Sequence, residues 1–288
     1  MTDNMNIQWY PGHMTKTRRQ IEADLKLVDA VCEIVDARIP VSSRNPDIDA
    51  ICGDKPRMIV LNRMDLADPA ATKKWAEYFR RKGMAVIATD CKSKKGISAF
   101  TPAARLACAE KLERDAKRGM NRPLRVMVVG IPNVGKSTLI NQISGRKSAK
   151  AENRPGVTRG KQWVTVDSGL QLLDTPGILW PKFEDPEVGM MLAYTGAVKE
   201  GVIDLEELAY RLMELLHKFY PQTLLERYKV EAPEGTPGWQ LLEMAARKRG
   251  YLISGGEVNT ERMAKVLLDE FRSGKLGNFT LEMPEDMV

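Results

Sequence analysis

The sequence predicts an α/β domain, with a mostly parallel sheet flanked by helices, followed by a small all-α domain. Over the first two-thirds of the 288 residues, short apolar runs alternate with amphipathic stretches, a pattern typical of βαβ units. After about Pro186 helical periodicity replaces this alternation. We therefore expect one domain over residues 1–185 and a second over residues 186–288.

Apolar runs followed by polar or Gly/Pro-bearing loops and then helical stretches predict buried parallel strands. There are four such runs: Ala30–Asp36, Arg57–Asn62, Met84–Thr89 and Arg125–Gly130. A further pair of runs, Gln162–Asp167 and Leu170–Asp174, brackets the turn Ser168-Gly169 and predicts a hairpin.

The predicted helical domain is indicated by apolar spacing and by capping residues. Apolar residues between Leu205 and Phe219 fall on one helical face, and Asp204 with Glu207 forms a capping box in front of that face. Asn259 is expected to cap a later helix. Prolines and paired glycines separate these stretches, so we expect several short helices.

Composition excludes some classes of protein and leaves others open. The formal charge of +6 is a mild basic excess and only weakly favours nucleic acid. The four cysteines form no Cys-x-x-Cys pair, which favours buried reduced thiols over a metal or redox site. No stretch approaches the roughly 18 apolar residues of a membrane span. The polar start, with Asp3, is not typical of a signal peptide, so we expect a cytoplasmic protein without membrane contact.

The most specific motif is a phosphate-binding loop. Residues 130–137 match G-x-x-x-x-G-K-[ST] at every fixed position, between an apolar strand and a helical stretch. Its glycines let backbone N–H groups wrap around phosphates, and the helix adds its positive end. Lys136 is expected to bridge the outer phosphates and Ser137 to bind Mg²⁺. The predicted nucleotide contacts of this loop are Asn133, Val134, Gly135, Lys136, Ser137 and Thr138.

Asn62-Arg63-Met64-Asp65 indicates which base is bound, because it resembles the Asn-Lys-x-Asp motif of GTPases. The Asp65 carboxylate would accept hydrogen bonds from the guanine N1–H and exocyclic amine, a donor pair that adenine lacks. The aliphatic stem of Arg63 can cover the base. Asp90 and Cys91 occupy the place of the loop that backs the base. Alone, the motif is equally a strand-end turn with a capping Asp.

Three further segments bear on hydrolysis. Asp174 and Gly177 match the Asp-x-x-Gly motif, in which the carboxylate holds the magnesium shell and the glycine N–H senses the γ-phosphate. Thr158 is the candidate switch threonine that completes the magnesium site. The apolar residues after Gly177 cannot orient water, so His13 is the candidate catalytic group. The alternative is that His13 caps or packs the first helix.

The order of the motifs is unusual, because the base motif precedes the phosphate loop, which indicates circular permutation of the sheet. This order, with Trp9–Met14, Asp36–Pro40 and Pro155–Thr158, resembles the YlqF-type circularly permuted GTPases. The resemblance implies a GTP hydrolase that times a late step of large ribosomal subunit assembly. It further implies that the helical domain contacts ribosomal RNA in the subunit or its precursor, with no DNA partner expected.

Some interpretations stay open at this point. In similar GTPases an asparagine at the position of Asn133 accompanies K⁺ beside the phosphates; otherwise it braces the loop. Basic clusters fit RNA only loosely, since a charge run is usually a solvated face. These clusters are Lys92–Lys95, Lys111–Arg118 and Arg247–Arg249. Two other functions compete: a GTP-gated RNA- or protein-binding switch module in which hydrolysis is secondary, and a P-loop kinase or ATPase.

Overall fold

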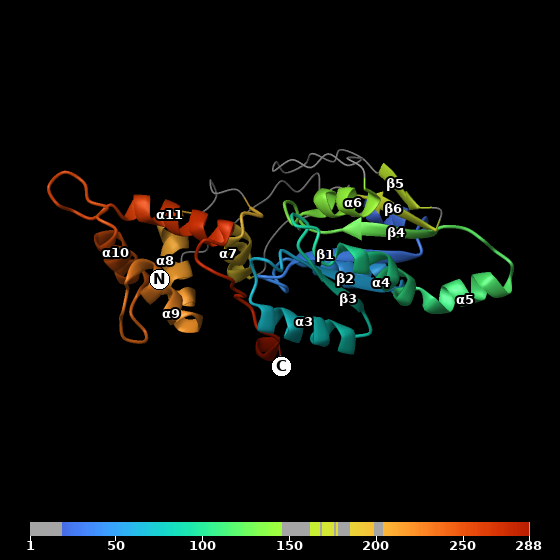
Figure 1. Cartoon of the computed structure of the whole chain (residues 1–288), viewed down its shortest axis with the longest axis horizontal. Helices are drawn as coiled ribbons and strands as arrows, with labels where there is room; N and C mark the ends of the chain where they lie inside the picture. The colour runs from blue at the N-terminus through green and yellow to red at the C-terminus, as the bar shows by residue number, and fades with distance from the viewer. Residues whose placement is uncertain are drawn as a thin grey trace.

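The structure is a computed structural model, and it describes residues 19–145, 162–167, 169–175, 177, 185–198 and 204–287. Its described strands form one six-stranded sheet in the order β3-β2-β1-β4-β6-β5 (Figure 1). The strands are β1 (Ala30–Asp36), β2 (Arg57–Asn62), β3 (Ala85–Thr89), β4 (Leu124–Val129), β5 (Gln162–Asp167) and β6 (Leu170–Asp174). Only β5 runs antiparallel to its neighbour, so the predicted mostly parallel sheet and its hairpin are confirmed.

Helices cover both faces of the sheet. On one face lie α4 (Phe100–Ala107) and α6 (Lys136–Ser144), whose apolar side chains join those of β1 and β4 in one core. On the other face lie α2 (Asp47–Cys52), α3 (Pro69–Arg81) and a helical turn at residues 19–25. β1 is buried at all seven positions, as a central parallel strand covered on both faces requires.

α5 (Ala109–Lys117) differs from these helices, because it buries none of its side chains and projects from the end of the sheet (Figure 1). It packs loosely because charged residues surround its apolar Leu112, which is only half-buried. The chain returns from α5 to the central strand β4.

The helices after residue 185 pack together beside the sheet (Figure 1). They are α7 (Pro186–Tyr194), α8 (Leu205–Phe219), α9 (Pro221–Tyr228), α10 (Gly238–Lys248) and α11 (Thr260–Ser273). Asp204 caps α8 by accepting from Glu207 N at 2.9 Å, but the Glu207 side chain pairs with Arg211, so only this half of the predicted capping box is seen. The predicted cap at Asn259 is confirmed, since Asn259 accepts from Arg262 N at 2.9 Å. α10 approaches α8 so closely that a Cβ on Gly238 would lie 2.0 Å from a backbone oxygen of α8.

The segment Asn278–Glu285, which we call the strap, leaves the helices and crosses back to the sheet (Figure 1). It bonds to the loops that follow β1 and β2 and finally reaches α3. The short helical turn η3 (Pro284–Met287), which begins at the end of the strap, lies against α3. The predicted division into two domains near residue 186 stays a prediction. Buried apolar residues from before and after this position belong to one hydrophobic core.

Candidate functional site

The predicted motifs follow the carboxyl ends of parallel strands. Asp36 ends β1, Asn62 ends β2 and Thr89 ends β3, while the phosphate loop follows β4 and Asp174 ends β6. Because the carboxyl ends of parallel strands meet at one edge, segments far apart in the sequence gather there. This edge is where open α/β sheets bind ligands.

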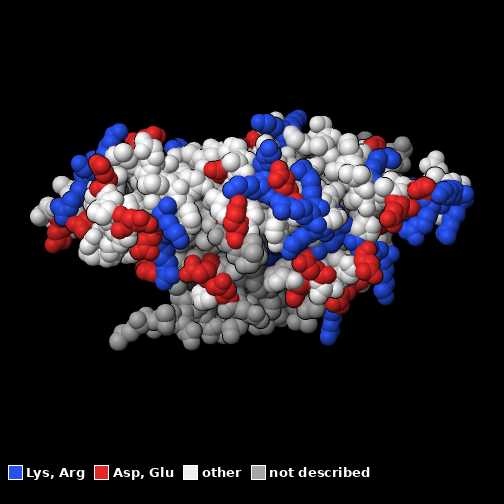
Figure 2. Space-filling model, turned by 90° about the horizontal axis from the view of Figure 1, so that it is seen from below, with Lys and Arg blue, Asp and Glu red and all other residues white. Residues whose placement is uncertain are grey.

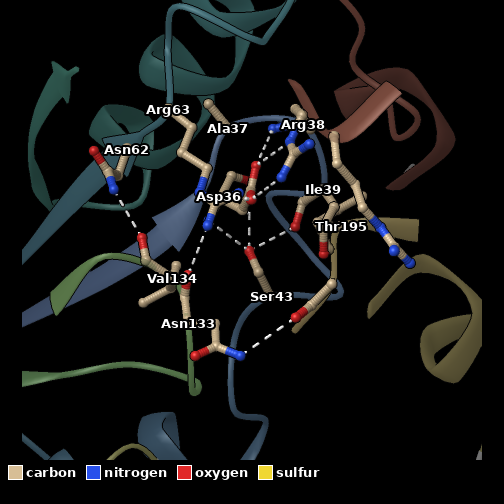
Figure 3. A network of polar contacts seen from close by, with 12 residues as sticks. Asp36, Ala37, Arg38, Ile39, Ser43, Asn62, Arg63, Asn133, Val134 and Thr195 are labelled. Atoms are coloured by element: carbon tan, nitrogen blue, oxygen red, sulfur yellow. Dashed lines mark hydrogen bonds and ion pairs between the residues drawn. The ribbon is translucent and has the colours of Figure 1, made fainter. Parts of the chain in front are cut away.

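The base motif braces the phosphate loop by two hydrogen bonds (Figure 3). Asn62 Nδ2 donates to Val134 O at 2.7 Å, and Arg63 Nη2 donates to Asn133 O at 2.7 Å. The partners lie 72 and 70 positions apart in the chain. Gly135 is required beside this contact, because a Cβ there would lie 2.4 Å from Asn62 Nδ2. Two motifs in permuted order therefore form one site.

The loop after β3 completes the base side of the site. Thr89 Oγ1 donates to Asn62 Oδ1 at 3.1 Å, and Thr89 O accepts from Met64 N at 3.1 Å. Asp90 accepts from Lys92 N at 2.8 Å, which fixes the turn that carries Cys91. Burial opposes ionisation of Asp90, but hydrogen bonds from the turn hold the pKa of its carboxyl below the usual value. Asp90 and Cys91 lie beside the base motif, and their contact with a nucleotide stays a prediction.

A buried ionic network connects the base motif to the helical region after residue 185 (Figure 3). Sequence reasoning did not assign this network a role. Asp36 accepts from Arg38 Nε at 3.0 Å and from Arg38 Nη2 at 2.8 Å. Arg63 Nε lies 3.6 Å from the same carboxylate, and Arg38 stacks over Phe271 of α11 at 5.5 Å. Burial disfavours the Asp36 carboxylate, yet the two guanidinium groups hold its pKa below the usual value. The predicted covering of a base by the Arg63 stem is not tested.

Lys136 and Asp174 meet on the phosphate side. Lys136 Nζ lies 3.0 Å from Asp174 Oδ1, and both side chains are buried. Asp174 Oδ2 is also buried and has no hydrogen-bond partner among the described residues. Such an oxygen, close to the first turn of α6, fits the shell of a hard cation. Gly177 packs against the phosphate loop, where its Cβ would lie 3.0 Å from Pro132 Cα.

Asn133 joins the phosphate loop to the helical region after residue 185. Its backbone is left-handed, with φ 61°, and its Nδ2 donates to Gly196 O at 3.3 Å (Figure 3). Gly196 follows α7, which Arg272 of α11 anchors by donating to Tyr194 O at 3.0 Å. Since Nδ2 contacts Gly196, Oδ1 is the atom that Asn133 can offer to a cation.

Comparison with known proteins decides the family. Residues 125–220 match the family model described as 50S ribosome-binding GTPase. Ribosome biogenesis GTPase A of Priestia megaterium is 45% identical over 285 residues, which cover 98% of each chain. The chain belongs to the ribosome biogenesis GTPase A family. It is thus a P-loop GTPase, and the predicted fold and GTP hydrolase class are confirmed.

Solved structures agree with this assignment. The GDP-bound structure of TM YlqF has a TM-score of 0.67 and 30% identity, and the match covers 93% of this chain and 100% of that one. GNP-bound YlqF from T. maritima has a TM-score of 0.62 and 29% identity, with coverage of 94% and 99%. The 50S ribosome-binding GTPase match begins in β4 of this GTPase, whereas the base motif lies before it, as circular permutation requires.

Two predicted site residues cannot be placed in the site. His13 and Thr158 lie outside the described residues, so their proposed roles in catalysis and in the magnesium site stay predictions. Ser137 and Thr138 lie in the first turn of α6, where the loop motif predicts them. His217, the other histidine, contacts Ala232 O at 3.1 Å within the helical region, which agrees with a structural role.

The surface of the GTPase carries uneven charge. Lys and Arg gather at the α5 end in Figure 2, and the helical end shows mixed charge. Arg247 and Lys248 are exposed at the end of α10, although Arg247 pairs with Glu243. Arg249 is partly structural, because it lies 3.6 Å from Glu270 and stacks over Tyr228.

Two expectations from composition can be compared with the structure. Cys32, Cys52, Cys91 and Cys108 are all buried and free. Burial raises the pKa of Cys52, Cys91 and Cys108 to about 11, so these thiols stay protonated near neutral pH. Among the described residues, no helix has the length and apolar character needed to cross a membrane.

Proposed function

We propose that this GTPase hydrolyses GTP to time a late step in the assembly of the large ribosomal subunit. The observation that carries the nucleotide part is the direct bracing of the phosphate loop by Asn62 and Arg63. The family relationship supports the ribosomal part, because the relatives are named for ribosome biogenesis. Through these contacts, binding of guanine at the base motif would affect the position of the phosphate loop, and binding of phosphate would affect the base motif.

Guanine selection is assigned to Asp65, whose exposed side chain follows the braced Asn62-Arg63 pair. In Asp65→Asn the side-chain N–H₂ would face the exocyclic amine of guanine, and two donors cannot bond to each other. Xanthine has a carbonyl at that position, which can accept from the new N–H₂. We expect Asp65→Asn to shift preference from GDP to xanthosine diphosphate in a fluorescence competition assay. Binding of ATP by the wild-type protein as tightly as GTP would refute the assignment.

The phosphate side is assigned to Lys136, Ser137, Asp174 and Gly177, with Thr158 completing the magnesium site. Mg²⁺ would be held by Ser137 and through the Asp174 shell, and it would neutralise charge that develops on the phosphates. Lys136 would exchange its contact with Asp174 for phosphate oxygens. We assign K⁺ binding to Asn133, and we assign orientation of the attacking water to His13.

The partner is proposed to be the large ribosomal subunit or its precursor, contacted through ribosomal RNA. Arg247 and Lys248, exposed on α10, would meet phosphates, which makes binding sensitive to salt. Co-sedimentation with large subunits should be stronger with a non-hydrolysable GTP analogue than with GDP. The double variant Arg247→Glu/Lys248→Glu should weaken it, whereas Lys73→Glu/Arg81→Glu, at two exposed positions of α3, is the charge-matched control.

This experiment distinguishes a GTPase that times assembly from a switch module in which hydrolysis is secondary. Equal co-sedimentation with both nucleotides would remove the timing role, and full binding by the double variant would move the contact elsewhere. If a variant without turnover is released from the subunit in the presence of GTP as readily as wild type, hydrolysis does not time the step and the switch module is the better description.

A further inference from the structure

The strap holds the loop that carries the predicted guanine-binding carboxylate. Four consecutive residues of this loop, Asp65–Asp68, bond to the strap through their backbone. Asn278 Nδ2 donates to Asp65 O at 2.7 Å and to Ala67 O at 3.2 Å. Phe279 N donates to Leu66 O at 2.9 Å, and Asp68 N donates to Thr280 Oγ1 at 3.3 Å.

Thr280 is the central residue of the strap and is completely buried. Besides accepting from Asp68 N, its hydroxyl donates to Ala37 O at 3.2 Å, so it joins the loops after β1 and β2. The Tyr220 hydroxyl, from the helical region, makes two hydrogen bonds to the Thr280 backbone. Tyr220 Oη donates to Thr280 O at 2.9 Å and accepts from Thr280 N at 3.1 Å. Thr280 thus connects Tyr220, between α8 and α9, with the base loop.

Apolar contacts fix the same segment. Phe279, only 1% exposed, packs between Tyr220 and Phe271, with ring centroids 4.9 and 5.8 Å away. At the end of α11, a Cβ on Gly274 would lie 2.6 Å from the side chain of Leu66. The base loop therefore rests on the helical region through both polar and apolar contacts.

We infer that Thr280 is a positioning residue for guanine recognition, holding the Asp65 loop in the geometry that lets its carboxylate meet both guanine donors. The inference rests on the proposed role of Asp65. Asp65 itself is exposed, so its backbone, rather than packing of its side chain, decides where the carboxylate lies. Hydrogen bonds to charged groups depend strongly on distance and angle, so a loosened loop weakens base selection before it weakens phosphate binding.

The experiment compares GDP with inosine diphosphate, which keeps N1–H but lacks the exocyclic amine. Loss of one hydrogen bond to a carboxylate is expected to give wild-type protein an affinity ratio of about tenfold or more in favour of GDP. Thr280→Val keeps the side-chain shape and removes the hydroxyl, so the ratio should fall about threefold or more. Thr280→Ser keeps the hydroxyl and should restore the wild-type ratio.

A general loss of stability would weaken both nucleotides alike and leave the ratio unchanged. Glu285→Gln is the matched control in the strap, because Glu285 contacts Lys74 of α3 at 2.8 Å and not the base loop. If Thr280→Val does not fold, the exposed Asn278→Asp variant replaces it. Its carboxylate cannot donate to Asp65 O or Ala67 O, so the ratio should again fall.

The outcomes distinguish this inference from the proposed function. An unchanged ratio in folded Thr280→Val overturns the positioning role of Thr280. If Thr280→Val does not fold, an unchanged ratio in Asn278→Asp overturns the positioning of the Asp65 loop by the strap, on which the role of Thr280 depends. Asp65→Ala is measured beside them. If Asp65→Ala leaves the ratio intact, the guanine assignment itself is wrong. If Asp65→Ala abolishes the ratio while the strap variant retains it, only the positioning role of Thr280 fails.

Discussion

Replacement of Asp36 by Asn tests whether the ionic network beside the base motif stabilises the fold. The Asp36 and Arg38 side chains are 4% and 1% exposed, and the pair makes two side-chain hydrogen bonds of 3.0 and 2.8 Å. Arg38 Nη1 has no hydrogen-bond partner in the part of the chain that the structure describes. The buried positive charge of Arg38 is therefore balanced by the Asp36 carboxylate. An asparagine would keep the shape but set an N–H₂ donor against a guanidinium donor.

Removing one partner of a buried ion pair costs about 3–5 kcal/mol, and we expect the lower end because Asn keeps one acceptor. For a protein of this size, about 3 kcal/mol lowers the midpoint of thermal unfolding by roughly 6–12 °C. Differential scanning calorimetry measures this shift directly. Asp49→Asn is the control, since the Asp49 side chain is 58% exposed, and its pairs with Arg44 and Arg57 are each worth about 0–1 kcal/mol.

The sign of the pH dependence provides a second check. The pKa of Asp36 is lower in the folded protein than the ordinary value of about 3.9 expected in the unfolded chain. Its stabilising contribution is therefore complete above that value and is lost as pH falls through the folded pKa. The difference between wild type and Asp36→Asn should be constant from pH 5 to 8 and should narrow below about pH 4. A variant that melts within about 2 °C of wild type at pH 7 would refute the reasoning.

Three other predictions concern the nucleotide site. Asn62→Ala leaves Val134 O and the Thr89 hydroxyl without their buried partner. The affinity for GDP in a titration should fall about tenfold, and an unchanged affinity would mean that the brace is dispensable. Turnover should be faster in potassium than in sodium, and Asn133→Ala should erase the difference; equal rates in the two salts for wild type would exclude the ion. His13→Ala should lower subunit-stimulated turnover about tenfold or more while GTP affinity is kept, in line with acid–base catalysis. Wild-type turnover in that variant would exclude His13 from catalysis.

Much of the sheet could be predicted because buried parallel strands are nearly continuous apolar runs. β1, β2, β5 and β6 have the predicted bounds, and the boundaries of β3 and β4 differ by one residue. The assembly of the site also followed from sequence, since loops after parallel strands share one edge. Neither conclusion needed knowledge of contacts between distant side chains.

The ionic network could not be predicted in the same way. An Asp-x-Arg sequence at the end of an apolar strand is a visible signal, because charged residues there require partners. Its meaning depends on Phe271, which stacks on Arg38 although the two residues are far apart in the sequence. Spacing within the strand carries no information about such a partner.

The strap was missed for a related reason. Phe279 and Leu281 alternate with polar residues, which is a weak indication of an extended segment with one buried face. Thr280 breaks that pattern, because it is buried although it is polar. Only the loops after β1 and β2 explain its burial, since they supply a donor and an acceptor for its hydroxyl.

The strap also has a consequence for synthesis of the chain. Asp68 is made 212 positions before Thr280, the residue that bonds to it. A nascent chain can form β1 to β4 from consecutive segments, but the loop behind Asp65 lacks its partners until the strap has been translated. Contacts this distant close late, after the local ones. The newly made protein would therefore acquire selective guanine binding as one of the last events of its own folding, after the phosphate loop has formed.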